Sequence, residues 1–423
     1  MTSTTFTVLF AVLLLASTMT TAYLALRQIA FVMRHRHQVP VAFAQNVTQQ
    51  AHEKAALYTV AKAQNGLVSL LIGSIVLLAW TLLGGLNLLN QMTLEWLKPG
   101  LVQQIVLILA FSFISGIIDL PMSWYQTFVL EQKFGFNKTS LKLWLQDMVK
   151  SSLVGLIIGV PLLAVVLYFM ESMGNRWWLW TWVFWMSFNA LLMLIYPTFI
   201  APLFNKFAPL DDENLKTRVA ALMQRSGFSA QGFYVMDGSR RSAHANAYFT
   251  GFGSGKRVVF YDTLLKQLSV DEVEAVLAHE LGHFKHKHIT KRLISMGLMT
   301  LLGFYILGFV MQQAWFYTGL GVMPALDSSN NGVALLLFML AAPVFTFMLT
   351  PIMTMMSRKD EFQADAYAAS QTNGEHLVSA LLKLYEDNAS TLTPDPLYAS
   401  IYYSHPPASQ RIPKILSHST AAT

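Results

Sequence analysis

Seven long apolar segments, separated by more polar ones, dominate the residue pattern of this chain of 423 residues. A helix rises ~1.5 Å per residue, so each segment is long enough to cross ~30 Å of hydrocarbon. The pattern therefore predicts a mainly α, polytopic membrane protein with seven transmembrane helices. We place these helices near residues 6–26, 67–87, 101–121, 151–170, 177–197, 294–315 and 333–353.

Two stretches lack this apolar character, and we expect both to lie outside the bilayer. The larger is 198–293, between spans 5 and 6, and the smaller follows span 7. We therefore divide the chain into five spans and their loops, the larger polar segment, spans 6 and 7, and a carboxyl-terminal part that completes the larger polar segment. The corresponding ranges are 1–197, 198–293, 294–353 and 354–423.

The stretch 198–293 combines helical and strand patterns and so predicts a small α+β domain. Residues 213–226 have the spacing of an amphipathic helix, and 233–236 and 257–261 have the character of short strands. Glycines at 251, 253 and 255 indicate a turn before the second strand. A further helix is predicted over 271–287. Ser269 and Glu272, spaced three apart, form a capping-box pattern at its start.

Composition agrees with a membrane protein and excludes other classes. Only 12% of residues are charged and 54% are hydrophobic, with mean hydropathy +0.44, whereas soluble proteins carry about 25% charged residues. The net charge of +6 would suit nucleic acid, but the basic residues follow membrane topology instead, so we expect no nucleic-acid partner. Without any cysteine, a bound zinc ion would need His and carboxylate ligands.

The basic residues also predict the orientation of the chain in the membrane. Of the 29 Lys and Arg residues, all except Lys98 and Arg176 lie in loops or ends that seven spans would place on one side. By the positive-inside rule the amino terminus is outside and the carboxyl terminus cytoplasmic. The membrane would be the inner membrane of a bacterium or the endoplasmic reticulum of a eukaryote.

Residues 279–283 read His-Glu-Leu-Gly-His, which is the H-E-x-x-H pattern of zinc peptidases. His279 and His283 are four residues apart, so on a helix both imidazoles can reach one metal ion. Glu280 lies beside them and can act on a water molecule. A surface helix rich in His and Lys is the alternative. The apolar run before the motif favours a buried site, where unpaired imidazoles would be costly without a metal.

A third ligand must come from elsewhere in the chain. The pattern with a third histidine fails, because Ile289 occupies its position. Residues 358–368 supply Asp360, Glu361 and Asp365 as candidates, unless they form an ordinary solvated helix face. Glu361 and Asp365 are four apart, so one can bind the metal while the other accepts the ring N–H of a ligand histidine. Both halves of the site lie within ~15 Å of the same membrane face, and spans 6 and 7 can bring them together as a helical pair.

The chain resembles the type I CAAX prenyl endopeptidases, which are seven-span zinc metallopeptidases. The shorter membrane heat-shock metalloproteases share two of its motifs but have fewer spans. The matching stretches follow in order along most of the chain: Glu131 to Asn137, Pro202 to Lys206, Ser242 to Phe249, Tyr261 to Leu264, His279 to His283, Glu361 to Asp365, and Ser404 to Pro407.

The resemblance implies roles for residues that spacing leaves open. It implies one zinc ion held by His279, His283 and Glu361, with Asp365 supporting the ligands and Glu280 as general base. It also implies that the spans enclose a large water-filled chamber roofed by a zincin-like peptidase domain.

Four further positions carry over from the resemblance. Asn246, with its neighbour Ala247, corresponds to an edge-strand position that holds a peptide backbone. His405 corresponds to a histidine that contacts the oxyanion, and Arg411 to a salt-bridging residue that holds this region in place. Without the family, Asn246 would be a turn residue and the other two part of an exposed tail. We expect His286 and His288 to be surface residues.

These observations predict an integral-membrane metalloendopeptidase that processes CAAX-type carboxyl termini of prenylated peptides. The same chemistry could instead serve the turnover of damaged membrane proteins, and the sequence does not separate the two. A transporter or receptor is a third hypothesis, because Asp119 and Asn189 lie within predicted spans. The expected partners are a peptide or protein substrate and the lipid bilayer, and the oligomeric state is left open.

Overall fold

The computed structural model describes residues 1–228, 232–250, 257–325 and 329–420. Within these ranges seven helical segments are long and apolar enough to cross a membrane, as the sequence predicts. Their bounds are Ser3–His35, Gln49–Trp80, Leu101–Glu131, Leu141–Ser172, Gly174–Phe204, His288–Val310 and Asn331–Gln371. The protein is therefore a mainly α, polytopic membrane protein.

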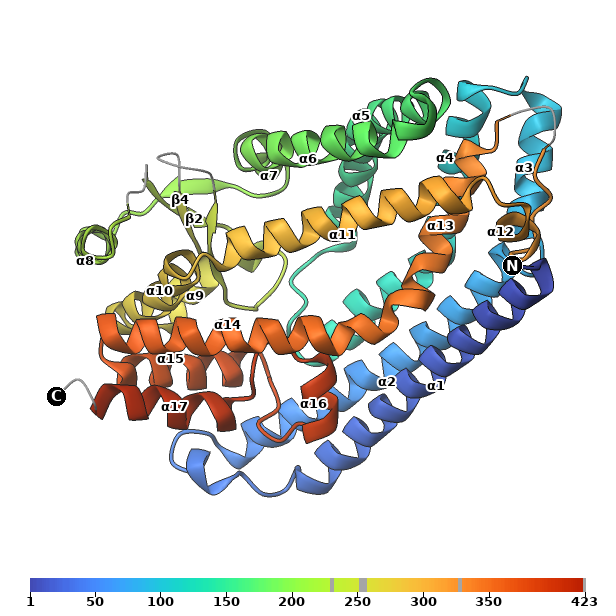
Figure 1. Cartoon of the computed structure of the whole chain (residues 1–423). Helices are drawn as coiled ribbons and strands as arrows, with labels where there is room; N and C mark the ends of the chain where they lie inside the picture. The colour runs from blue at the N-terminus through green and yellow to red at the C-terminus, as the bar shows by residue number, and fades with distance from the viewer. Residues whose placement is uncertain (229–231, 251–256, 326–328, 421–423) are drawn as a thin grey trace.

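The membrane part consists of long helices joined by short turns, with α1 and α2 side by side along one flank (Figure 1). Thr2, Thr48 and Ser140 cap α1, α2 and α5, each accepting a hydrogen bond from a backbone N–H of the first turn. The helices are α1 (Ser3–His35), α2 (Gln49–Trp80), α3 (Gly85–Trp96), α4 (Leu101–Tyr125), α5 (Leu141–Ser172), α6 (Trp177–Ile195), α11 (His288–Val310), α12 (Ala314–Thr318) and α13 (Asn331–Thr346). Two π-helical segments, Gln126–Glu131 and Tyr196–Ile200, continue α4 and α6.

Two predicted spans have different limits in the structure. The helix of span 2 begins at Gln49 and ends at Trp80, because the chain turns at 81–84, where Gly84 has a φ of 78°. Span 7 does not stop at 353: after a short 3-10 turn it continues as α14 (Thr350–Gln371). Glu361 therefore lies on the same long helical segment as the last span.

The remaining elements form an α+β unit around a four-stranded sheet of order β1-β2-β4-β3. β2 and β4 are parallel, and the other two pairs are antiparallel. The strand order places β3 at an edge of the sheet. The elements are α7 (Ala201–Phe204), β1 (Phe207–Pro209), α8 (Glu213–Arg225), β2 (Gly232–Met236), β3 (Ala247–Thr250), β4 (Arg257–Tyr261), α9 (Asp262–Gln267), α10 (Val270–Lys285), α15 (Gly374–Asp387), α16 (Pro396–Tyr402) and α17 (Ala408–Thr420).

The residue pattern predicts α8, β2 and β4 to within a residue, but it predicts neither β1 nor β3. The edge strand at β3 was implied only by the family resemblance, through Asn246 and Ala247. The predicted turn glycines at 251–255 lie outside the described residues. One core unites the two polar stretches of the chain: Phe260 of β4 and Leu277 of α10 are buried together with Ala368 of α14 and Leu381 of α15. Burying a side chain of this kind stabilises the fold by ~1.5–3 kcal/mol, so the two stretches form one unit.

Spans 6 and 7 do not form the helical pair that we expect from the sequence. Instead α11 packs chiefly against α6, where the Trp182 indole donates a hydrogen bond to the Gly297 carbonyl at 2.8 Å, and α13 packs against α4. The pair that joins the two halves of the site is α10 and α14.

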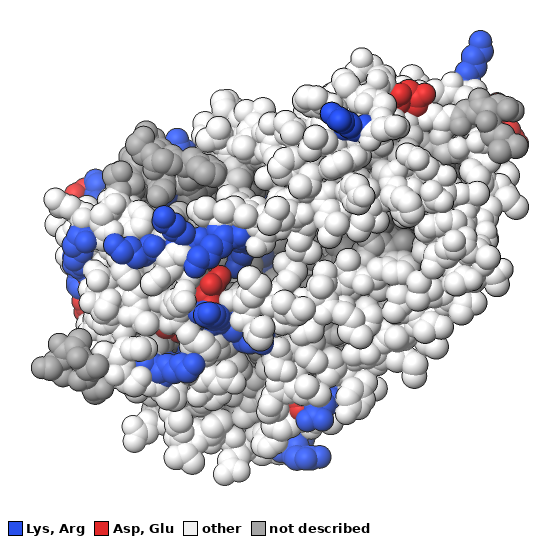
Figure 2. Space-filling view, in the orientation of Figure 1, with Lys and Arg blue, Asp and Glu red and all other residues white. Residues whose placement is uncertain are grey.

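Charge is unevenly distributed over the surface. In Figure 2, Lys and Arg gather over the end that carries α10, α14 and α17, while a broad face over the long helices is almost free of charge. Such a face suits contact with lipid. Among the described residues, the helices line a partly open apolar cavity of about 990 Å³, and a second of about 840 Å³ adjoins α2 and the sheet edge. A single water-filled chamber stays a prediction.

Candidate metal centre and active site

Helix α10 presents the H-E-x-x-H residues and is firmly capped. Ser269 and Glu272 form the predicted capping box, and the Glu272 carboxylate also accepts hydrogen bonds from Ser379 at 2.6 Å and Lys383 at 2.7 Å. The helix ends at Lys285 rather than at the predicted 287. Lys287 adopts a left-handed conformation, with φ of 57°, which starts α11 in a new direction.

Close contact between α10 and α14 brings the distant ligand candidates together. A Cβ built on Gly282 would lie 2.8 Å from the Cα of Ala364, so only glycine fits between the two helices without a shift. Gly282 follows His279 by three residues and precedes His283, and Ala364 lies between Glu361 and Asp365. The tight crossing therefore places the histidine pair opposite the acidic pair.

Three side chains converge on one point. The Nε2 atoms of His279 and His283 are 3.3 Å apart, and they lie 3.5 and 3.4 Å from oxygens of Glu361. Ligand atoms of all three lie within 4.8 Å of one another. Oε2 of Glu361 is buried and makes no hydrogen bond, which is costly for a carboxylate unless a cation completes the site. This oxygen, the rest of the Glu361 carboxylate and the two imidazoles form a group of ligand atoms that fits a divalent metal ion.

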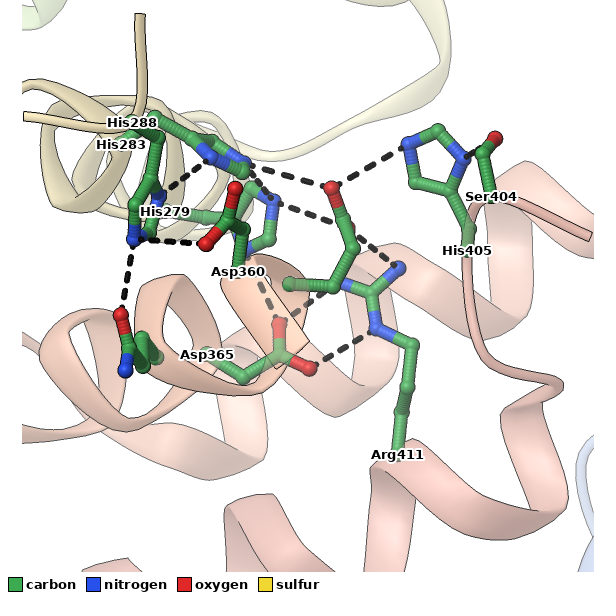
Figure 3. A network of polar contacts seen from close by, with 10 residues as sticks. His279, His283, His288, Asp360, Asp365, Ser404, His405 and Arg411 are labelled. Atoms are coloured by element: carbon green, nitrogen blue, oxygen red, sulfur yellow. Dashed lines mark hydrogen bonds and ion pairs between the residues drawn. The ribbon is translucent and has the colours of Figure 1, made fainter. Parts of the chain in front are cut away.

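Asp365 and Arg411 lie directly behind the ligand group, as Figure 3 shows. The Asp365 carboxylate is 2.9 Å from Nδ1 of His279, and this contact favours the protonated imidazole. Arg411 donates to both of its oxygens, at 2.8 and 2.6 Å, and comes within 3.8 Å of Glu361. Both residues are buried, so this bidentate pair fixes the orientation of the carboxylate that holds the imidazole.

The prediction that His288 is a surface residue is wrong. His288 is only 2% exposed, its Nδ1 lies 3.0 Å from Nδ1 of His283, and its Nε2 lies 2.8 Å from Oε1 of Gln363. The left-handed turn at Lys287 folds the chain back and buries the ring. His286 is exposed, as expected. Asp360 approaches His288 at 3.4 Å and not the metal-binding group. The signal in the sequence was a third histidine five residues after His283.

Glu280 and His405 come to the ligand group from different elements: Glu280 is on α10, and His405 lies in the segment between α16 and α17. Glu280 is partly buried, and burial raises the pKa of its carboxyl above the ordinary value, which suits a group that takes and returns a proton. His405 has its Nε2 3.4 Å from Glu361 and its Nδ1 3.0 Å from the Ser404 hydroxyl. Its ring is exposed, and it lines the 840 Å³ cavity.

The predicted peptide-holding residues lie where β3 begins. The carbonyl of Asn246 accepts a hydrogen bond from the Tyr261 N–H of β4, so by antiparallel alternation the backbone of Ala247 faces the open side of the sheet. The Asn246 side chain is exposed and accepts from the Ala247 N–H at 2.8 Å. Asn246 also lines the cavity that reaches His405. By contrast, Asp119 and Asn189, on the distant span helices, join neither this cavity nor the ligand group.

Comparisons with known proteins identify the family of the chain. The family described as CAAX prenyl protease N-terminal, five membrane helices, matches residues 28–206, and peptidase family M48 matches residues 209–419.

Individual relatives cover most of the chain. CAAX prenyl protease 1 of Saccharomyces cerevisiae is 39% identical over 71% of this chain and 69% of its own length. The Homo sapiens homolog is 31% identical over 92% and 91%. The crystal structure of S. mikatae Ste24p superposes with a TM-score of 0.89 at 32% identity, covering 97% of this chain and 99% of that one. The chain therefore belongs to the CAAX prenyl protease 1 family and is an integral-membrane metallopeptidase.

Proposed function

We propose that the protein binds one zinc ion through His279, His283 and Glu361. Two imidazoles and one carboxylate leave a coordination position open, which is the composition of catalytic rather than structural zinc sites. When bound there, zinc would supply Lewis-acid chemistry, lowering the pKa of a water molecule and polarising a peptide carbonyl.

The side chains around this position divide the remaining work. Glu280 takes a proton from the attacking water and returns it to the leaving amine, which its raised pKa favours. His405 lies on the cavity side, where an N–H donor can stabilise the oxyanion, an effect of ~3 kcal/mol. Asp365 and Arg411 hold His279 in the orientation that binding requires.

The open edge of β3 is the proposed place for the substrate backbone. An extended peptide laid beside Ala247 would add a fifth strand, with main-chain hydrogen bonds that fix its register. Asn246 stands at the start of this edge, within the cavity that also reaches His405. A bond held there would lie next to Glu280 and the zinc ligands.

The proposed substrates are prenylated proteins and peptides that end in a CAAX sequence. The relatives are named for this activity, and the site itself supports it. Helix α14 is continuous with span 7, so the carboxyl-terminal half of the site is built on a membrane helix. A peptide anchored by a lipid chain would meet the site without leaving the membrane surface. This placement is the observation that carries the proposal.

Cleavage of a farnesylated CAAX tetrapeptide, with metal content measured on the same samples, tests the proposal. The wild type is expected to contain zinc near one per chain and to release the last three residues. Glu280→Gln should keep zinc and lose cleavage by at least ~100-fold. Near-normal turnover by Glu280→Gln would remove it from the mechanism. Equal cleavage of an unprenylated, unfolded membrane segment would point to protein turnover instead.

We also propose that the amino terminus lies outside the membrane and the peptidase part in the cytoplasm. The clustering of Lys and Arg around that part supports this orientation (Figure 2). The chain contains no cysteine, so single cysteines placed at Thr2 and His418 can be labelled without background. In sealed membrane vesicles whose cytoplasmic face is outward, an impermeant thiol reagent should label position 418 and not 2. The reverse labelling pattern would show that the chain has the opposite orientation in the membrane.

A further inference from the structure

The cavity of about 840 Å³ beside the active site has a second end that the proposed mechanism does not use. Its near end is formed by His405, Arg411 and Asn246. Its far end is formed by α2, where Tyr58 and Lys62 stand one helical turn apart. The cavity thus leads from the reacting centre to the boundary between α2 and the peptidase unit.

The cavity is electrostatically one-sided. Its described lining includes no Asp or Glu, and its charged side chains are Lys62 and Arg411. Arg411 is committed to Asp365 by two hydrogen bonds. Lys62 makes no ion pair or hydrogen bond to the described residues. Its ammonium lies 5.0 Å from the ring centre of Tyr58, and its positive charge interacts electrostatically with the nearby Glu131 carboxylate. Lys62 is therefore the charged residue of the cavity lining that has no direct ion-pair partner among the described residues.

Contacts between side chains connect Lys62 with the first residues of the substrate edge. Asn388, at the end of α15, accepts hydrogen bonds from the Ala245 N–H at 3.3 Å and from His244 at 3.0 Å. The His244 ring lies 3.6 Å from Glu131, which accepts a 2.7 Å hydrogen bond from the Tyr58 hydroxyl. These contacts link the Lys62 region of α2 to the residues that directly precede β3, and Lys62 shares the cavity lining with Ala245 and Asn246.

Strand direction then decides which end of a substrate points towards Lys62. An antiparallel peptide on β3 has its carboxyl-terminal side near Ala245, because β3 runs from Ala247 to Thr250. Ala245 and Asn246 line the cavity and Thr250 does not, so a parallel peptide would direct its carboxyl end away from it. Three extended residues span ~10 Å, which carries the chain end from the cut bond into the cavity.

We propose that Lys62 binds the free α-carboxylate of the substrate, three residues beyond the bond that is cut. This inference rests on the proposed function and adds to it a recognition site for the end of the chain. The site would select for a free carboxyl terminus at a fixed distance from the zinc. The Tyr58 ring, fixed by its hydrogen bond to Glu131 behind the cavity wall, lies beside the Lys62 ammonium, while the flexible lysine stem adjusts to the last residue.

Two farnesylated tetrapeptides, one with a free carboxylate and one with a carboxamide terminus, test the inference. The full-length protein is assayed in an uncharged detergent, so that anionic lipid headgroups do not contribute. A charge-assisted hydrogen bond should give the wild type roughly tenfold higher kcat/KM for the acid, mainly through KM. Lys62→Gln should lose this preference by losing activity on the acid alone, and Lys62→Arg should keep most of it.

Lys54→Gln is the matched control. Lys54 is also on α2 and also lies 5.0 Å from an aromatic ring, that of Phe136, but it does not line the cavity. Its substitution should leave the acid-to-amide ratio unchanged. If Lys62→Gln lowers cleavage of acid and amide equally, or keeps the wild-type ratio, the inference is overturned.

A binding measurement separates failure of this inference from failure of the proposed function. An aliphatic tripeptide and its amide, which stand for the released product, are titrated into Glu280→Gln protein with and without Lys62→Gln. Tighter binding of the acid that disappears with Lys62→Gln supports the carboxylate site even if no prenylated peptide is cleaved. Equal binding of acid and amide overturns it even if prenylated peptides are cleaved.

Discussion

Gly282 of α10 and Ala364 of α14 touch at the point where the two halves of the site meet. A Cβ on Gly282 would lie 2.8 Å from the Ala364 Cα and 3.1 Å from its carbonyl oxygen. Both obstacles are backbone atoms, which cannot move aside as a side chain could. The separation of the histidine pair from Glu361 is therefore set by the absence of a side chain at one position.

Gly282→Ala should separate α10 from α14 and weaken the metal-binding group. We expect a loss of ~1–3 kcal/mol in stability from overpacking, with a lower zinc content. Thermal unfolding and metal analysis of the purified protein measure the two effects. Gly73→Ala is the control, because a Cβ there meets no atom within 4 Å. Full zinc content in Gly282→Ala would show that the helices can shift apart at no cost to the site.

Asp365→Asn should leave the proposed zinc ligands in place but hold them less firmly. The substitution removes the charge that supports His279 and deprives the buried Arg411 of its bidentate ion pair, at a cost of ~3–5 kcal/mol. Loss of support behind a ligand histidine typically lowers metal affinity ~10–100-fold. Chelator competition followed over time measures this change. Wild-type zinc retention would mean that Asp365 only packs against Arg411.

His288 and His286 offer a matched pair of substitutions. His288 is buried against His283 and Gln363, so His288→Asn should lower zinc affinity roughly tenfold by freeing the His283 ring. His286 is exposed, and His286→Asn should change nothing. Zinc titration of both metal-stripped variants compares them directly. If the two variants bound zinc with equal affinity, His288 would only pack in the core and would not support His283.

Acid should weaken the start of α10 through Glu272. Burial acts to raise the pKa of this carboxyl, but hydrogen bonds from Lys383, Ser379 and the Ser269 N–H outweigh it and hold the pKa below its ordinary value. The stabilisation is therefore complete above a pH of ~4.5 and is lost as the pH falls through the lower, folded-state pKa. The Tm of Glu272→Gln should lie below wild type at pH 7, and the gap should narrow towards pH 4.

Substitution of the exposed Glu375, in the first turn of α15, is the control for this pH series. Glu375→Gln should show a small Tm difference that changes little with pH. If the gap for Glu272→Gln stayed constant from pH 7 to pH 4, the capping carboxylate would not be the group that titrates.

Local chemistry let the sequence predict several elements. Transfer of an apolar segment into hydrocarbon depends on its own residues, so the seven spans follow from composition alone. The capping box of α10 involves only residues three apart, Ser269 and Glu272, and the structure confirms it. His279 and His283 face the same way because they are one helical turn apart. Each of these features is decided within one element.

Contacts between elements that are far apart in the chain could not be predicted from the sequence pattern. The backbone contact of Gly282 with Ala364 determines that Glu361, and not Asp360, faces the two imidazoles. A single left-handed residue, Lys287, buries His288. Lys62 lies more than 180 residues before Ala245 yet shares a cavity with it. Local propensity and periodicity determined the elements of this protein, but only the packing of those elements decided which side chains meet, because contact depends on distance in space and not along the chain.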